Sequence, residues 1–342
     1  MTIPKKNNGK TYELEDLNED QKEIAQYILQ AITDWINCSR ENRMKDFKPI
    51  RLTVRGVAGS GKSTLIHTLS TAVKRLFSCD SVVCINGPTG CCAFSVGGKT
   101  VHSAWSISPF KPSITPSAET MKKLFLRHSR LVLLMVDERS MISSSLLACL
   151  ESYAKQTVHL GRNNTEPWGF IPVVVVFGDD GQLPPIETGA FYAFERKQSN
   201  MGTEKLNLRY RGEQLFLQLG RDVMQLKTIK RQDPSQIRFH RILKGLRAEK
   251  EEDALSESDI EYLYSFLLHP DNDRFTKTEM LMITERSTWL FANKAPRNLH
   301  NLKKMFELHS ALNPVARIHA KPESKITQDS HFGEDSILRI LR

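Results

Sequence analysis

The chain has 342 residues, of which 40% are hydrophobic, and its 48 basic and 39 acidic residues give a formal net charge of +9. A chain of this length can bury a substantial core, and length alone suggests about two domains. Its longest apolar runs, residues 131–136 and 173–177, are far shorter than the roughly 20 residues of a membrane-spanning helix, which excludes that class of protein. Residues 1–9 carry no secretion or import pattern, so we expect an intracellular protein without a membrane partner, in the nucleus in preference to the mitochondrion or cytoplasm.

The six cysteines form no pair of closely spaced pairs of the kind that zinc sites use. Cys91 and Cys92 are adjacent, a spacing that suits neither a zinc knuckle nor a structural disulfide. We therefore expect all six cysteines to be reduced side chains that serve packing.

Positive charge concentrates in residues 204–250. This segment holds twelve Lys and Arg residues and five Asp and Glu residues, a local net charge of +7. A run of charge is normally a solvated helical surface. The alternative is a face that follows the phosphates of a nucleic acid, and composition leaves both interpretations open.

The first two thirds of the chain alternate between helical and strand patterns. Residues 12–36 space their apolar side chains at helical intervals, and Asn18 and Gln21 are placed like a capping box at the helix start. Strands are expected at residues 50–54, 82–85, 131–136 and 173–177. Because helical patterns separate these strands, we expect an α/β fold with a mainly parallel sheet covered on both faces.

A helical, basic pattern takes over near residue 204 and continues to about residue 266. The apolar run 280–284 predicts a late strand, and a helix is expected around residues 298–302. The last part of the chain carries no readable pattern. The predicted organisation is a lead-in helix at 1–48, a first domain at 49–203 and a second region at 204–342.

Residues 56–63 read Gly-x-x-x-x-Gly-Lys-Ser between a predicted strand and a predicted helix, the context that a phosphate-binding loop requires. Glycines let backbone amides turn inward around a phosphate chain, and the helix start adds partial positive charge. Lys62 would neutralise the β and γ phosphates, and the Ser63 hydroxyl would hold magnesium. The alternative is a glycine-rich turn with an exposed lysine. The nucleotide-binding candidates of this loop are Gly56, Ala58, Gly59, Ser60, Gly61, Lys62, Ser63 and Thr64.

Asp137 and Glu138 directly follow the apolar run 131–136, where the carboxyl end of a buried strand would face a ligand. Asp137 can hold a magnesium ion through water, and Glu138 can accept a proton from an attacking water. Two acids after a strand are a weak signal by themselves. After a phosphate loop at this distance they predict a hydrolytic site.

The strand at 173–177 runs into Gly178 and Asp179, and Gln182 follows three residues later. Gln182 can donate to a γ-phosphate oxygen and accept from a water, which makes it a candidate sensor. The alternative is that Gly-Asp starts a turn, the following Pro184 and Pro185 stiffen it, and Gln182 is merely exposed.

Five segments together resemble the ordered motif series of Pif-one-type DNA helicases, the RecD-like group of superfamily 1B. These segments are residues 56–63, 87–90, 97–103, 137–141 and 178–185. The resemblance covers about residues 14–310 and is specific because five motifs occur in the right order. It implies a RecA-like phosphate-loop domain followed by a partial second RecA-like domain, with ATP and magnesium as cofactors.

By this resemblance, Leu17, Asn18 and Gln21 match an adenine-contacting element ahead of the phosphate loop. Trp168 and Gly169 match an aromatic-glycine turn before the sensor strand. Other segments match those that line a single-stranded DNA path, where hydroxyls and amides grip phosphates without reading bases. The DNA candidates are Pro88, Thr89, Gly90, Thr100, His102 and Ser103.

Arg211, between Tyr210 and Gly212, resembles the arginine segment that opens the family's second motor domain. The resemblance implies that Arg211 reaches the γ phosphate across the cleft and stabilises transition-state charge. The alternative is one more surface arginine in a basic helix. The catalytic candidates are Lys62, Glu138, Gln182 and Arg211.

The sequence departs from the family pattern at several places. Arg139 stands where an apolar residue is common, and it could pair with an acid or face solvent. Asp180 and Gly181 replace a bulky apolar pair, which leaves the placement of Gln182 open. Two later family motifs are not found before Arg342, so we expect a partial second motor domain.

The resemblance implies an ATP-dependent motor that moves 5′ to 3′ on single-stranded DNA. Such a motor unwinds duplexes and their junctions in DNA repair, recombination and telomere maintenance, and we expect it to be a monomer. An alternative is a truncated chain that binds ATP and single-stranded DNA without unwinding. A phosphate-loop enzyme of another kind, such as a small-molecule kinase, would show no DNA-stimulated hydrolysis.

Overall fold

The computed structural model describes residues 13–110, 112–158, 166–185, 203–229, 235–248, 254–267 and 274–309, with only the backbone at 203–205. The chain divides into two compact units, Met1–Ala254 and Leu255–Arg342. The first unit contains a sheet and all the candidate site residues. Within the described residues, no helix is both long enough and apolar enough to cross a bilayer.

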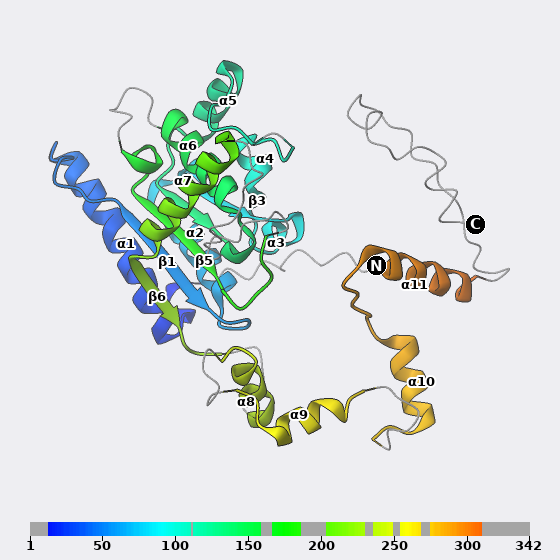
Figure 1. Ribbon diagram of the computed structural model, residues 1–342. Coiled ribbons are helices and arrows are strands. Elements are labelled where there is room, and N and C mark those ends of the chain that lie inside the picture. The colour runs from blue at the N-terminus through cyan, green and yellow to red at the C-terminus, as the bar shows by residue number, and fades with distance from the viewer. Residues whose placement is uncertain are drawn as a thin grey trace. The chain divides into compact units, whose positions relative to one another are not determined.

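The first unit is built on a six-stranded sheet in the order β3-β2-β4-β5-β1-β6 (Figure 1). Its strands are β1 Ile50–Gly56, β2 Val83–Gly87, β3 Lys99–Thr100, β4 Leu133–Val136, β5 Val173–Gly178 and β6 Asp222–Leu226. Every pairing is parallel. All carboxyl ends therefore lie at one edge of the sheet, as the alternation of strands and helices predicted.

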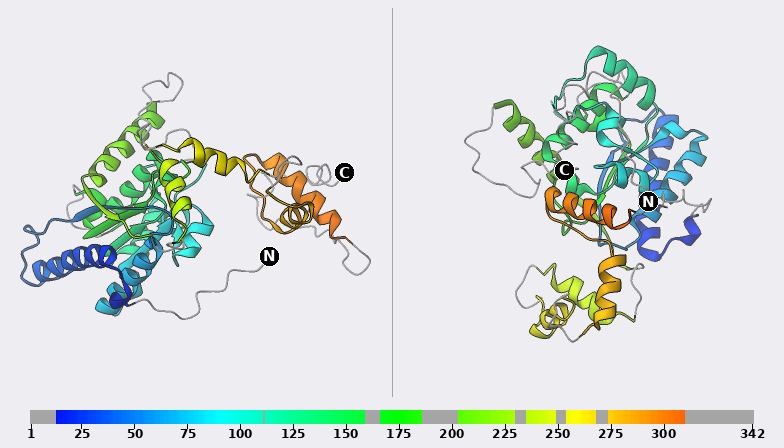
Figure 2. Two further views of the ribbon diagram at one scale, coloured as in Figure 1. Left: turned by 90° about the horizontal axis from the view of Figure 1, so that it is seen from below. Right: turned by 90° about the vertical axis from the view of Figure 1, so that its right-hand side faces the viewer.

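Helices cover both faces of this sheet (Figure 2). The helices and short helical turns of the first unit are η1 Leu14–Asp16, α1 Glu19–Arg40, α2 Lys62–Phe77, η2 Asp80–Val82, α3 Gly90–Ser95, α4 Val101–Trp105, α5 Ala118–His128, η3 Arg139–Met141, α6 Ser144–Thr157, η4 Pro167–Phe170, α7 Thr203–Leu219 and α8 Ile237–Gly245. Strand β5 shows the two layers: Val173, Val175 and Phe177 pack with α1 and α2, whereas Val174 and Val176 pack with α6 and α7. Burial on both faces explains why this strand is a continuous apolar run.

The predicted lead-in helix is confirmed as α1. Asn18 is its N-cap and accepts a hydrogen bond from the Gln21 backbone amide, while the Gln21 side chain accepts from the Asn18 amide. Ile24, Ile28 and Ile32 recur at four-residue spacing, so they share one helix face, and all three are buried. This face packs against the sheet beside α2.

The predicted domain boundary near residue 204 differs from the structure. Strand β6 pairs with β1 along Leu52–Gly56, and the Thr53 hydroxyl donates to the Leu219 carbonyl at the end of α7. Residues 203–226 therefore complete the first sheet. Sequence patterns missed β6 because it is a short edge strand with mostly exposed side chains, and the two-residue β3 is too short to give a pattern.

The strand predicted at residues 280–284 is wrong. These residues lie in α10, Lys277–Arg286, which begins with a capping box formed by Thr276 and Glu279. A short apolar run has no periodicity of its own, so the capping signal decides in favour of the helix. The helix expected around residues 298–302 is confirmed as α11, Lys294–Glu307.

The described part of the second unit consists of three helices: α9 Glu257–Tyr264, α10 and α11. A partial second RecA-like domain within 204–342 stays a prediction, because the described residues of this unit include no strand. The last 20 or so residues, which carry no readable pattern, lie outside the described part of the chain, as do all residues after 309.

Candidate functional site

Three of the predicted motifs meet at the carboxyl edge of the sheet. Strand β5 lies between β4 and β1, so the segments that follow these three strands are neighbours. They are the loop 57–61 after β1, the carboxylates Asp137 and Glu138 after β4, and the turn that begins at Asp179 after β5. Ligands of open α/β sheets bind at this edge.

The loop after β1 has the backbone shape of a phosphate cradle. Gly59 and Gly61 adopt positive φ angles of 88° and 86°, which side chains disfavour. A Cβ atom at Gly56 would overlap the Ser60 hydroxyl, and one at Gly61 would overlap the Gln21 amide. The sequence therefore needs glycine at these turns, as predicted.

Lys62 and Gln21 both turn toward this loop. The Lys62 ammonium donates to the carbonyls of Gly56, at 2.7 Å, and Val57, at 3.4 Å. The Gln21 amide donates to the Gly61 carbonyl at 3.0 Å and is buried. The start of α1 is thus fixed against the phosphate loop, where the adenine-contacting element was predicted.

Asp137 and Glu138, directly after β4, each have a carboxylate oxygen without a hydrogen-bond partner among the described residues. These two atoms, Asp137 Oδ1 and Glu138 Oε2, are buried. The pKa of Asp137 is raised to about 6, chiefly by burial and also by the charge of the neighbouring Glu138, while Lys62 acts in the opposite direction. Buried acceptors without partners are costly, so this pair is arranged for a cation or a donor that the chain itself does not supply.

The residues at this edge fit a magnesium ion. Ser63, the second residue of α2, offers a hydroxyl oxygen, and Asp137 offers a carboxylate oxygen that has no partner among the described residues. Magnesium prefers hard oxygen ligands of these two kinds. Within the described ranges, no three His, Cys, Asp or Glu side chains gather into a metal cage. Phosphate oxygens and water would therefore complete the coordination.

Asp179 organises the turn that carries Gln182. Its side chain accepts from the Gly181 amide at 3.2 Å and from the Gln182 amide nitrogen at 3.5 Å, and its carbonyl accepts from the Gln182 backbone at 3.1 Å. Arg247 donates to both oxygens of Asp179, at 3.1 and 2.7 Å. Gly-Asp does start a turn, as the alternative interpretation expected, and the sensor role of Gln182 stays a prediction. Sequence analysis missed Arg247 because nothing in its spacing singles it out within the basic segment.

The DNA candidates lie one strand farther along the same edge. Strands β2 and β3 pair with Gly87 opposite Thr100, which brings the segments 88–90 and 100–103 together. The Thr89 hydroxyl caps α3 and the Thr100 hydroxyl caps α4, while Gly90 and Ser103 are exposed. His102 contacts the Ile107 carbonyl through Nδ1 at 3.1 Å, and Pro88 is partly exposed.

Arg211 does not join this edge, contrary to the prediction. It lies in α7 of the first unit, and its guanidinium binds Glu151 of α6 at 2.5 Å. The other Glu151 oxygen accepts from the Trp168 backbone, in the turn before β5 begins. A buried carboxylate requires a cation, so Arg211 is held on the side of the strand starts, away from the phosphate loop. Trp168 and Gly169 do form a turn, with φ angles of 63° and 62°.

Some positive charge in residues 204–250 is already paired within the chain and would not be free to follow phosphates, the second of the two interpretations of this segment. Three of its arginines bind carboxylates of the chain: Arg209 with Glu213, Arg211 with Glu151 and Arg247 with Asp179. Other charges counted in that segment, Lys230, Arg231, Asp233, Glu249 and Lys250, lie outside the described residues, as do the side chains of Glu204 and Lys205.

Comparison with known families decides the assignment. The model of the PIF1-like helicase family matches residues 16–199, more than half of the chain. The chain belongs to the PIF1-like helicase family. The resemblance predicted from the five motifs is thereby confirmed.

Two curated relatives share parts of the chain. The ATP-dependent DNA helicase PIF1 of Candida albicans is 29% identical over 190 residues, which are 50% of this chain and 20% of that protein. The ATP-dependent DNA helicase PIF4 of Trypanosoma brucei brucei is 31% identical over 137 residues, 39% of this chain and 16% of that protein. The matches thus span about a fifth or less of these relatives.

Solved Pif1 structures share the fold. The crystal structure of Candida albicans Pif1 superposes with a TM-score of 0.58 at 20% identity, covering 86% of this chain and 55% of that one. Bacteroides Pif1 in complex with ADP-AlF3 and ssDNA gives a TM-score of 0.51 at 20% identity, covering 84% and 60%. The predicted RecA-like parallel sheet of a PIF1-like helicase is confirmed.

Proposed function

We propose that this chain is the ATP-hydrolysing motor core of a DNA helicase. The observation that carries the proposal is the meeting of the phosphate loop, the unpartnered carboxylates and the Gln182 turn on three neighbouring strands. Family membership and the names of the relatives, ATP-dependent DNA helicases, support it.

Each residue has a distinct role in this proposal. Lys62, now bonded to loop carbonyls, would exchange them for the β and γ phosphates, and the loop amides with Gln21 would hold the nucleotide. Ser63 and Asp137 would hold magnesium, which neutralises phosphate charge when bound. Glu138 would accept the proton of the attacking water, and Gln182 would contact the γ phosphate.

We place single-stranded DNA along Pro88–Gly90 and Thr100–Ser103, because these segments are adjacent on the site edge and expose Gly90 and Ser103. Contacts of this kind grip phosphates and do not select a base sequence. Relatives have been crystallised with ssDNA, in keeping with this partner. Binding should therefore weaken as salt concentration rises.

We further propose that the chain moves from 5′ to 3′ and unwinds duplex junctions in repair, recombination and telomere maintenance. It would act as a monomer in the nucleus. A second candidate is a chain that binds ATP and single-stranded DNA without unwinding, since the relatives are much longer than the matched segment.

An unwinding assay separates the two candidates. Partial duplexes with a 5′ tail or a 3′ tail are incubated with ATP, magnesium and the chain, and released strand is measured. Release from the 5′-tailed substrate supports the motor and its direction. Binding of ATP and of the tail without release supports the second candidate, and release only from the 3′-tailed substrate contradicts the proposed direction.

A further inference from the structure

The buried Arg139 forms an ion pair with the partly exposed Asp180, two residues after the end of β5. Arg139 Nε donates to Asp180 Oδ1 at 3.1 Å, and Arg139 Nη2 donates to Oδ1 at 2.6 Å and to Oδ2 at 2.5 Å. The Arg139 side chain is only 4% exposed, and that of Asp180 is 35% exposed.

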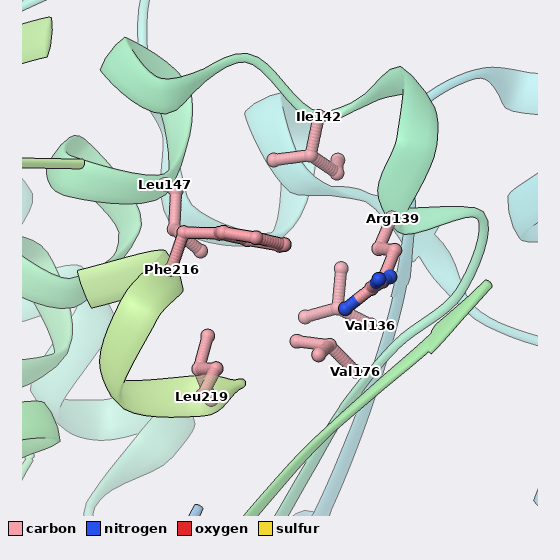
Figure 3. Close-up of a pocket in the computed structure, with 7 residues that line it drawn as sticks. All are labelled: Val136, Arg139, Ile142, Leu147, Val176, Phe216 and Leu219. Carbon is pink, nitrogen blue, oxygen red and sulfur yellow. The ribbon is translucent and has the colours of Figure 1, made fainter. Parts of the chain in front are cut away.

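The residues around Arg139 favour its contact with Asp180. Its side chain lies beside Val136 and Val176 in an apolar pocket, with Phe216 of α7 facing it (Figure 3). The guanidinium lies 5.0 Å from the centre of the Phe216 ring. A buried guanidinium needs an anion, and Asp180 provides one.

Gly178 leaves room for the arginine. A Cβ atom at this last residue of β5 would overlap Arg139 Cγ. Burial lowers the pKa of Arg139, and the bonds to Asp180 counteract that shift. The absence of a side chain at Gly178, the apolar packing and the ion pair thus all favour the same conformation of the Arg139 side chain.

The pair connects the two halves of the proposed hydrolytic centre. Arg139 follows Glu138, whose backbone is in the left-handed region with φ 50°. Asp180 lies two residues before Gln182, in the turn organised by Asp179. A shift of the turn relative to β4 must therefore break the ion pair or move Arg139 out of its pocket.

We propose that Arg139 and Asp180 are positioning residues that hold the Gln182 turn at a fixed place relative to Glu138 during ATP hydrolysis. Neither side chain need touch the nucleotide. The inference rests on the proposed ATPase function and adds to it how this chain keeps the Gln182 turn in place.

A double-mutant cycle tests the proposal on the full chain, with Arg139→Met, Asp180→Asn and the double variant. The measurements are kcat and KM for ATP hydrolysis, the Kd for a fluorescent ADP, and the free energy of unfolding in urea. We expect each single variant to lower kcat roughly tenfold, while the Kd for ADP stays within about threefold because the phosphate loop is intact. The double variant should be no slower than the slower single variant. Arg139→Lys, which keeps the charge but loses the planar fork, should recover kcat only in part.

Arg55 provides a matched control. It contacts the same Asp180 carboxylate at 3.4 Å but is 55% exposed, so Arg55→Met should change kcat less than about twofold. An effect of Arg55→Met as large as that of Arg139→Met would overturn the proposal, because any nearby charge would then suffice.

Other outcomes are equally decisive. Folded single variants with wild-type kcat, or kcat losses that simply multiply in the double variant, overturn the positioning role while leaving the ATPase function standing. Loss of unfolding free energy with unchanged kcat makes the pair structural only. A wild-type chain that binds ADP but hydrolyses no ATP overturns the proposed hydrolysis and this inference with it.

Discussion

The Trp105 indole N–H donates a 2.9 Å hydrogen bond to the side-chain oxygen of Asn86, and both residues are fully buried. Asn86 stands at the end of β2, directly before the segment 87–90, and Trp105 ends α4. The Asn86 carbonyl accepts from the Asp137 amide at 2.8 Å. One asparagine thus contacts the candidate metal ligand and the last residue of α4, the helix that begins within the candidate DNA segment 100–103.

Trp105→Phe should weaken the link between these segments. The change leaves the buried Asn86 oxygen with only the weak Cys84 thiol, 3.7 Å away, as a donor. We expect a loss of about 1–2 kcal/mol in the free energy of unfolding. Stimulation of ATP hydrolysis by single-stranded DNA should fall more than unstimulated hydrolysis. Trp35→Phe is the control, because the Trp35 N–H has no hydrogen-bond partner among the described residues. Equal losses in both variants would show that ring size alone matters.

Arg211→Met should lower stability and spare catalysis. The change leaves Glu151, 3% exposed, without its cation. We expect a loss of about 2 kcal/mol, below the roughly 3–5 kcal/mol of a fully buried pair because Arg211 is 37% exposed. At a temperature where the variant is folded, kcat should stay near the wild-type value. The exposed Arg221→Met serves as control; a collapse of kcat at unchanged stability in Arg211→Met would restore the arginine-finger interpretation.

Gly212→Ala should be strongly destabilising although Gly212 lies inside a helix. Such a change in an open helix stabilises by about 1 kcal/mol. Here a Cβ atom would overlap the Ser144 carbonyl oxygen, where α7 crosses α6, so we expect a loss of about 2 kcal/mol or more. Thermal unfolding measures the change. Gly220→Ala, whose Cβ would meet only ordinary contacts at 3.4 Å and beyond, should leave Tm nearly unchanged; similar Tm losses in both variants would contradict the packing argument.

The buried His128 should make folding sensitive to mildly acidic pH. The pKa of His128 is lowered to about 4, chiefly by burial and also by the charges of Arg127 and Lys99, while the contact of Nε2 with the Ala104 carbonyl acts in the opposite direction. The unfolded chain takes up a proton near pH 6.5, whereas the folded chain does so only near pH 4. Stability should therefore fall as pH drops from 6.5 toward 4, by up to about 3 kcal/mol from this group.

The comparison with His128→Gln isolates this effect. Urea unfolding at several pH values should give a shallower pH dependence for the variant between pH 6.5 and 4. Parallel curves for the two proteins would show that His128 takes up its proton equally in the folded and unfolded chains.

The sequence predicted those parts of the fold that depend on interactions between residues close together in the chain. The glycines of the phosphate loop, the Asn18 capping box and the buried strands carry their structure in neighbouring residues. Parallel strand pairing then brings Asp137 and Gln182 to one edge whatever the detailed packing. The candidate nucleotide site therefore followed from the sequence.

Contacts between residues far apart in the chain could not be predicted from these local patterns. Arg211 matched a motif by its neighbours, but the buried Glu151, 60 residues away along the chain, determines its place. Strand β6 is held by pairing with β1 and shows little pattern of its own. The partnership of Arg139 and Asp180 depends on β4 and β5 being adjacent, which the spacing of the residues does not reveal.

Steady-state ATP hydrolysis with and without single-stranded DNA directly tests whether the chain is a DNA-stimulated ATPase. It is measured for the wild-type chain beside Lys62→Ala, which weakens phosphate binding, and Glu138→Gln, which removes the proton acceptor and keeps nucleotide binding. We predict DNA-stimulated hydrolysis in the wild type, and its loss in both variants with Kd for ATP raised only by Lys62→Ala. Hydrolysis that DNA does not change, or that survives in Glu138→Gln, would contradict the account.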